Sequence, residues 1–132
     1  MRSVVLALLL FVAGLANAKD LPAADAAAIK AAGIPIYEQA VFLDGSREGG
    51  YRFATTQPLD AVRKWYRGRL ADWVLFDQYG AWVLHKERKG APLPEIIGKR
   101  QVSVATNPDM AGMYKIGKDM TTEIVIVAQE LK

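Results

Sequence analysis

The fold is decided by residues 51–70, which read YRFATTQPLDAVRKWYRGRL. In the first five residues, larger side chains at alternate positions share one side, which is the pattern of a strand with one buried face. Beyond Pro58 the apolar residues take up helical spacing and, at about 100° per residue, fall within a stripe roughly 80° wide. This stripe consists of Leu59, Val62, Tyr66 and Leu70. A strand followed directly by an amphipathic helix predicts one side of a hydrophobic core.

Outward from this stretch, five more segments have the composition of strands: residues 40–44, 73–78, 81–86, 101–106 and 123–128. Turn residues between them predict hairpins, and the alanine-rich residues 20–33 predict a first helix, which Gly33 would end. The predicted fold is α+β: a mostly antiparallel sheet of about six strands with two helices, in the order α-ββ-α-ββ-ββ, with the helices packed on one face. Residues 87–100 and 107–122 are expected to be long loops.

The N-terminal residues predict a secretory signal peptide. Arg2 precedes an apolar run over residues 4–12, and residues 16–18, Ala-Asn-Ala, form a small-residue cleavage site. The run is too short to cross a bilayer, which needs about 20 residues. We therefore expect cleavage after Ala18, a periplasmic or secreted location, and a single domain over residues 19–132 with no transmembrane segment.

Charge and residue types argue against several classes of function. Signal cleavage removes one of the 17 basic residues and none of the 14 acidic ones, which leaves a net charge of +2; this is too weak to argue for nucleic acid. The chain contains one histidine and no cysteine, so it lacks the usual ligands of a zinc site. Neither a Gly-x-Gly-x-x-Gly pattern nor a phosphate-binding loop occurs. We therefore expect no metal, no cofactor and no nucleic-acid partner.

Two groups of residues predict a binding surface. Trp65 lies off the apolar stripe of the second helix with Arg69 one turn further on, and tryptophan beside arginine is typical of a binding hot spot. Residues 86–100 carry five basic residues against two acidic ones, which favours an acidic protein or an anionic membrane surface as partner. For Trp65 the alternative is that the first helix or a loop covers its ring, and for residues 86–100 it is a solvated connection. The predicted binding residues are Trp65, Arg69, Arg88, Lys89, Lys99 and Arg100.

The single histidine gives a catalytic alternative. His85 could act as a general base in a small hydrolase or lyase if a carboxylate oriented it, and Asp77 and Glu87 are its nearest candidates in the predicted hairpin. A structural strand histidine is the competing interpretation. A third hypothesis is a carrier of a small apolar ligand, with a cavity between the second helix and the sheet.

Residues 34–84 also resemble a known type of domain. The spacing Pro-x-Tyr-x-x-Ala at residues 35–40 precedes a strand that ends in Thr55, and the following helix contains Trp65-Tyr66 before Trp73. This arrangement looks like that of small bacterial envelope domains of unknown function, many of which look like lipoproteins; this chain lacks the lipid-bearing cysteine. The resemblance implies an α+β envelope domain and supplies no catalytic residue. The leading hypothesis is therefore a non-enzymatic periplasmic domain that binds an envelope protein or another envelope component.

Overall fold

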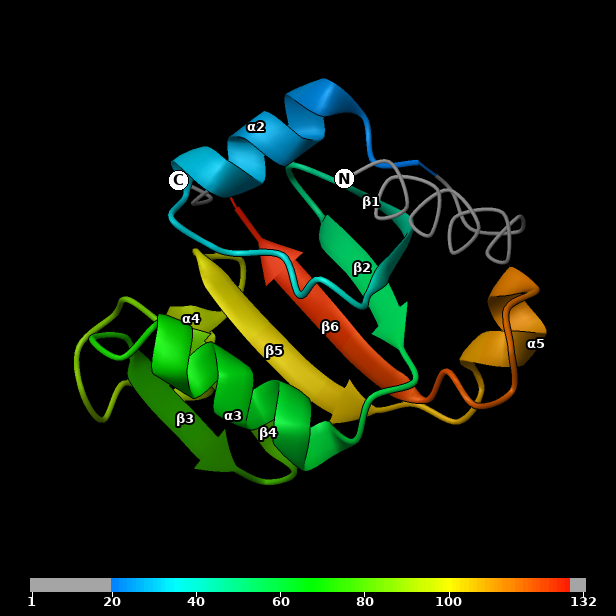
Figure 1. Cartoon of the computed structure of the whole chain (residues 1–132). Helices are drawn as coiled ribbons and strands as arrows, with labels where there is room; N and C mark the ends of the chain where they lie inside the picture. Colours follow the sequence, from blue (N-terminus) through cyan, green and yellow to red (C-terminus); the bar gives the residue numbers. More distant parts are fainter. Residues whose placement is uncertain (1–19, 129–132) are drawn as a thin grey trace.

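The structure, a computed structural model, describes residues 20–128, which contain six strands and four helices (Figure 1). The helices are α2 (Ala23–Ala31), α3 (Leu59–Arg69), α4 (Leu93–Ile96) and α5 (Met110–Tyr114). The strands are β1 (Val41–Ser46), β2 (Gly50–Thr55), β3 (Val74–Gln78), β4 (Ala81–His85), β5 (Gln101–Thr106) and β6 (Thr122–Val127). The predicted α+β fold is confirmed, and the predicted signal peptide lies outside the described residues.

All six strands form one antiparallel sheet in the order β1-β2-β6-β5-β4-β3. β6 lies between β2 and β5, so that Ile124 is opposite Phe53 on one side and opposite Val104 on the other. The hairpins β1–β2 and β3–β4 form the two ends of the sheet, as expected for strands that follow one another in the chain. This strand order, which the sequence alone did not predict, leaves β1 and β3 at the edges.

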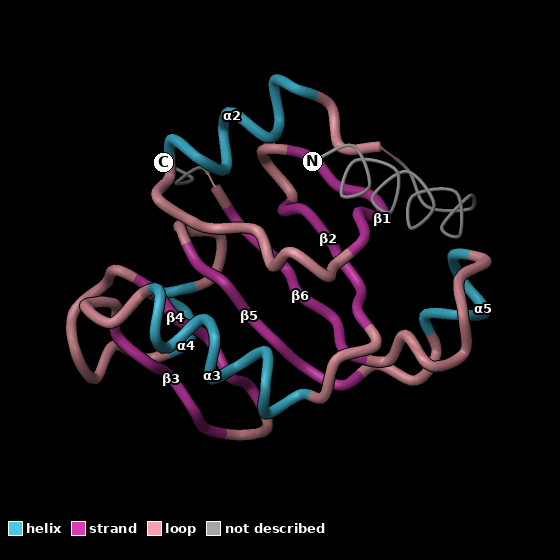
Figure 2. Tube along the Cα trace, viewed as in Figure 1, coloured by secondary structure: helices cyan, strands magenta, loops and turns pink. Residues whose placement is uncertain are grey.

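The first face of the sheet is covered by α2 and α3, which lie on the near side in Figures 1 and 2. Ile29 of α2 and Val62 and Tyr66 of α3 are fully buried in one hydrophobic cluster. The sheet contributes Tyr51, Phe53, Trp82, Leu84, Val102, Val104, Ile124 and Ile126 to this cluster. Burial of each large apolar side chain contributes about 1.5–3 kcal/mol, so the predicted stripe of α3 forms the main core.

Two tyrosine hydroxyls fix the elements that cover this face. The hydroxyl of Tyr66 donates to the carbonyl of Pro35 at 3.0 Å, and that of Tyr51 donates to the carboxylate of Asp25 in α2 at 2.7 Å. Burial and this hydrogen bond raise the pKa of Tyr51 to about 12. The helix α2 and the extended lead-in after it are therefore held to the sheet by directional bonds as well as by apolar contact.

The second face carries α4 and α5, so the described chain has four helices where two were expected. The two segments predicted to be long loops each contain a short helix with one fully buried residue: Ile96 of α4 and Met110 of α5. Each packs on a separate small cluster of sheet residues. The expected placement on one face describes α2 and α3 only, because apolar residues on the second face, such as Phe76 and Val83, also need cover.

Candidate functional site

Trp65 is half-buried among other aromatic rings. Its ring meets those of Tyr37 and Tyr66 edge to face, with centroids 5.1 and 4.9 Å apart, a geometry that aromatic pairs prefer. The guanidinium carbon of Arg69 lies 4.7 Å from the centroid of the Trp65 ring. The stacking of Arg69 on Trp65 was expected from their spacing of four residues, which places them on the same side of the helix.

An open hollow of about 560 Å³ lies beside Arg69, between α2 and the extended lead-in. Its walls are mostly apolar and come from Ala26, Ile29, Gly33, Ile34, Pro35 and Ile36, and its two basic residues are Lys30 and Arg69. Both basic side chains are exposed.

Carbonyls near the end of α2 already accept backbone hydrogen bonds. The amides of Gly33 and Ile34 donate to the carbonyls of Lys30 and Ile29 at 2.9 and 3.3 Å, and Gly33 adopts the positive φ of 78° that this helix ending requires. Lys30 and Arg69 are the charged residues in the lining of this hollow. A group with an apolar part and a negative charge therefore matches it best.

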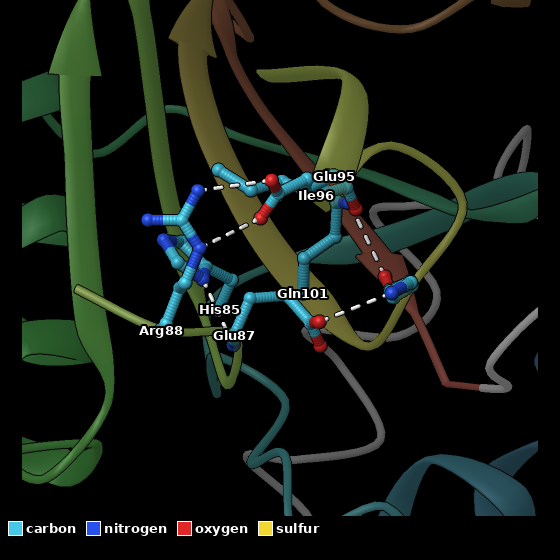
Figure 3. A network of polar contacts seen from close by, with 7 residues as sticks. His85, Glu87, Arg88, Glu95, Ile96 and Gln101 are labelled. Carbon is cyan, nitrogen blue, oxygen red and sulfur yellow. Dashed lines mark hydrogen bonds and ion pairs between the residues drawn. The ribbon is translucent and has the colours of Figure 1, made fainter. Parts of the chain in front are cut away.

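The basic segment over residues 86–100 lies mainly on the other side of the sheet, with α4. Figure 3 shows Arg88 bound to Glu95 through two contacts, of 3.1 and 2.9 Å. Lys99 donates to the carboxylate of Glu87 at 3.1 Å. Two of the four predicted binding bases in this segment are therefore used in internal ion pairs.

The predicted binding residues consequently form two separate groups. Trp65 and Arg69 lie together on α3, whereas Arg88, Lys89, Lys99 and Arg100 flank α4 across the sheet. Lys89 is exposed. Nε of Arg100 is buried and makes no hydrogen bond within residues 20–128. The sequence could not show this separation, because it depends on which face of the sheet each connection crosses.

His85 is 1% exposed and lines a second hollow, of about 370 Å³, between β3 and residues 90–94. Its Nδ1 accepts the backbone N–H of Glu87 at 3.0 Å, so the neutral ring carries its proton on Nε2. Burial lowers the pKa of His85, although the charge of Glu87 acts in the opposite direction. A ring in this tautomer can donate a hydrogen bond into the hollow but has no free lone pair with which to act as a base.

Neither carboxylate proposed for catalysis orients His85. Asp77 is opposite Trp82 in the β3–β4 register, and His85 is opposite Val74. Because paired residues of a sheet point to the same face and neighbours alternate, Asp77 and His85 lie on opposite faces. Glu87 lies beside His85 (Figure 3), but its carboxylate is bound to Lys99. The geometry therefore does not assemble an acid–base pair at His85.

A polar network on the second face was not anticipated. The hydroxyl of Tyr114 in α5 accepts a hydrogen bond from Arg52 at 2.7 Å and donates one to Asp44 at 2.9 Å. Nε of Arg52 lies 3.1 Å from the carboxylate of Glu123, without the alignment of a hydrogen bond. Burial lowers the pKa of Arg52, but the bond to Tyr114 and the nearby carboxylates outweigh it, so the pKa is raised. The only signal in the sequence was the presence of charged residues, Asp44, Arg52 and Glu123, within predicted strands.

Two properties of the described residues bear on the expected absences. Within residues 20–128, no group of three or more histidine, cysteine, aspartate or glutamate side chains is placed to hold a metal ion. In the same part of the chain, no helix is both long and apolar enough to cross a bilayer.

Comparisons with known protein families, with curated proteins and with solved structures found no match to this chain. The resemblance of residues 34–84 to small envelope domains therefore stays a prediction.

Proposed function

We propose that this protein is a non-enzymatic binding domain of the bacterial cell envelope, and that it recognises a partner protein through the hollow beside Arg69, between α2 and the extended lead-in. The observation that carries the proposal is the position of Arg69, which stacks on Trp65 and also lines the apolar hollow that contains Lys30. The ligand best suited to this site is a peptide segment in which a carboxylate lies next to an aliphatic side chain, as at a C-terminus.

The magnitudes are consistent with recognition of a short segment. Full burial of one leucine side chain contributes about 1.5–3 kcal/mol. A carboxylate about 4 Å from a basic group gains about 1 kcal/mol in water-like surroundings. These gains are offset by the translational and side-chain freedom lost on association, and a dissociation constant of 1 mM already requires about 4 kcal/mol. A short peptide should therefore bind weakly, and a folded partner needs further contacts.

Two further observations support an envelope location and a binding role. The N-terminal residues have the pattern of a secretory signal, and the chain has no cysteine, histidine pair or oriented histidine–carboxylate pair within residues 20–128. Arg69 is held by the tryptophan ring before any ligand arrives, which reduces the side-chain entropy lost on binding.

The experiment is a nuclear magnetic resonance titration of the protein with acetyl-Ala-Ala-Ala-Leu. We expect shift changes in residues 26–36 and at Arg69, with millimolar affinity. The same peptide with an amidated C-terminus should bind at least several-fold more weakly, because it lacks the charge that Lys30 and Arg69 attract. Decanoate, which has the same chemistry without a peptide backbone, tests whether a lipid-like acid is preferred.

Arg69→Ala and Arg67→Ala form a matched pair of variants. Both residues are exposed in the last turn of α3, and each substitution removes one positive charge, but only Arg69 lines the hollow. Arg69→Ala should abolish the peptide-induced shifts, and Arg67→Ala should preserve them. Equal loss in both variants, or shift changes elsewhere on the surface, contradicts the proposal.

A further inference from the structure

The strand β3 is an open edge of the sheet. It pairs with β4 alone, over five residues without a register shift. Within residues 20–128, its outward backbone groups make no hydrogen bond to any turn, loop or side chain. The other edge strand, β1, differs because its register shifts between Phe42 and Asp44, and a bulge of this kind hinders the addition of a further strand. β3 has no such interruption.

A hollow lies directly beside this edge. The 370 Å³ hollow is lined by the edge strand, by His85 and by residues 90–94, which lead into α4. Phe76 and His85 belong to the second face of the sheet, and both are buried. In a strand added to β3, every second side chain would point to this face. One such side chain would enter the hollow.

His85 supplies a buried hydrogen-bond donor in this hollow, whose lining is mixed and also includes Asp77 and Gln78 of the edge strand. Its Nδ1 is occupied by the Glu87 amide, and Nε2 makes no hydrogen bond to a described residue. Among the described residues, the completely buried side-chain nitrogens without a partner are Nε of Arg52 and Nε of Arg100. Nε2 of His85 is not one of them, so protein atoms do not enclose it completely. A buried imidazole whose remaining N–H meets the hollow favours a side chain that carries one acceptor oxygen.

Tyr79 is the third feature, at the end of the edge strand. It lines the same hollow and is 92% exposed. Its φ of +54° and that of Gly80, +79°, form the tight turn between β3 and β4. At the first of these positions asparagine or glycine is sterically preferred. An exposed tyrosine in a conformation unfavourable to it indicates a contribution other than to the turn.

We infer that the β3 edge and the adjoining hollow bind an extended segment of a partner polypeptide, which adds to the sheet as a seventh strand. The backbone of the segment pairs with the outward groups of β3, and one side chain with an apolar body and an acceptor oxygen, such as threonine, enters the hollow below His85. Tyr79 covers the end of the added strand. This site is separate from the hollow beside Arg69, because the two lie on different faces of the sheet.

The test uses the alternating heptapeptide acetyl-Lys-Val-Thr-Val-Thr-Val-Lys-amide as the probe. Amide hydrogen exchange of Val74 to Gln78 should slow at least several-fold on addition of the peptide, with no change in β1. A version N-methylated on alternate residues keeps every side chain but loses the donors along one edge. It should lose binding if the backbone pairs with β3. Two methylated peptides are compared, one methylated on the odd-numbered and one on the even-numbered residues, so that each blocks a different edge. If both bind as tightly as the unmethylated peptide, strand addition is overturned.

Two protein variants make the test independent of folding. Tyr79→Asn should weaken the probe several-fold while leaving the melting temperature equal or higher. Lys115→Asn is the matched control, because Lys115 also has a φ of +54° but lies after α5, far along the chain from β3. It should raise stability without changing binding. Unchanged binding by Tyr79→Asn removes Tyr79 from the site, and protection of β3 by self-association in sedimentation assigns the edge to a second copy; either result overturns the proposal as stated.

Discussion

The two faces of the sheet differ in how they are covered. On the first face, α2 and α3 are long enough to present an apolar side to the strands, and the large buried apolar residues belong to one cluster. On the second face, α4 and α5 have four and five residues and cover separate clusters. Hydrogen bonds from Tyr114 and ion pairs around α4 supplement those contacts. A short helix without its own amphipathic face thus depends on individual anchors.

The largest expected effect compares one core residue from each face. Tyr66→Ala should lower the free energy of unfolding by about 3–5 kcal/mol, because it leaves a cavity in the continuous cluster. Met110→Ala, on the second face, should cost about 2 kcal/mol, since the small cluster around α5 can collapse into the space. Both residues are fully buried. Urea denaturation measures both changes, and a larger loss for Met110→Ala would reverse the comparison between the faces.

Deleting one hydroxyl from each face sharpens the comparison. Tyr114→Phe removes a group that bonds both Arg52 and Asp44 and should cost about 1–2 kcal/mol. Tyr66→Phe removes one bond to the Pro35 carbonyl and should cost about 1 kcal/mol. Denaturation midpoints test the order of the two variants. If the hydrogen bonds of Tyr114 add no net stability over bonds to water, Tyr114→Phe will be as stable as the unmodified protein.

A smaller effect concerns acid pH on the second face. Burial lowers the pKa of His85 in the folded protein. In the unfolded chain the pKa of histidine is about 6.5. As the pH falls below that value, the unfolded chain takes up a proton that the folded chain resists, so stability decreases on acidification. His85→Asn keeps an acceptor for the Glu87 amide and should show less loss between about pH 7 and 5. Parallel stability curves for the two proteins would argue against this role.

The smallest predicted change is a gain in stability. Tyr79 and Lys115 both have positive φ, a conformation that asparagine tolerates better than either residue. Replacing each with asparagine should therefore raise the free energy of unfolding by about 0.5–1 kcal/mol. Thermal unfolding of the two single variants checks this, and a loss of stability in both would show that their side chains contribute more than their backbone conformation costs.

The long, periodic elements could be predicted from the sequence. Alternation and helical spacing in residues 51–70 predict β2, α3 and the buried positions Val62 and Tyr66. The helices α4 and α5 could not be predicted, because one turn of helix shows no period. Ile96 and Met110 become buried only through sheet residues distant in sequence.

The candidate sites follow the same division. The contact of Arg69 with Trp65 is local, since four residues separate them, and was predicted. The separation of Arg69 from the basic residues around α4, and the placement of Asp77 and His85 on opposite faces, depend on strand register and on the path of the loops. Neither of these two arrangements can be predicted from neighbouring residues in the sequence.

The central position of β6 has a consequence for when the protein can fold. While residues 122–127 are still inside the ribosome, β2 and β5 have been synthesised but lack the strand that joins them. The emerging chain can form the β1–β2 hairpin and the β3–β4–β5 unit only as two unconnected halves. Because the joining contacts span long sequence separations, the complete sheet forms slowly and late. The continuous hydrophobic core can therefore close only after the last strand has left the ribosome.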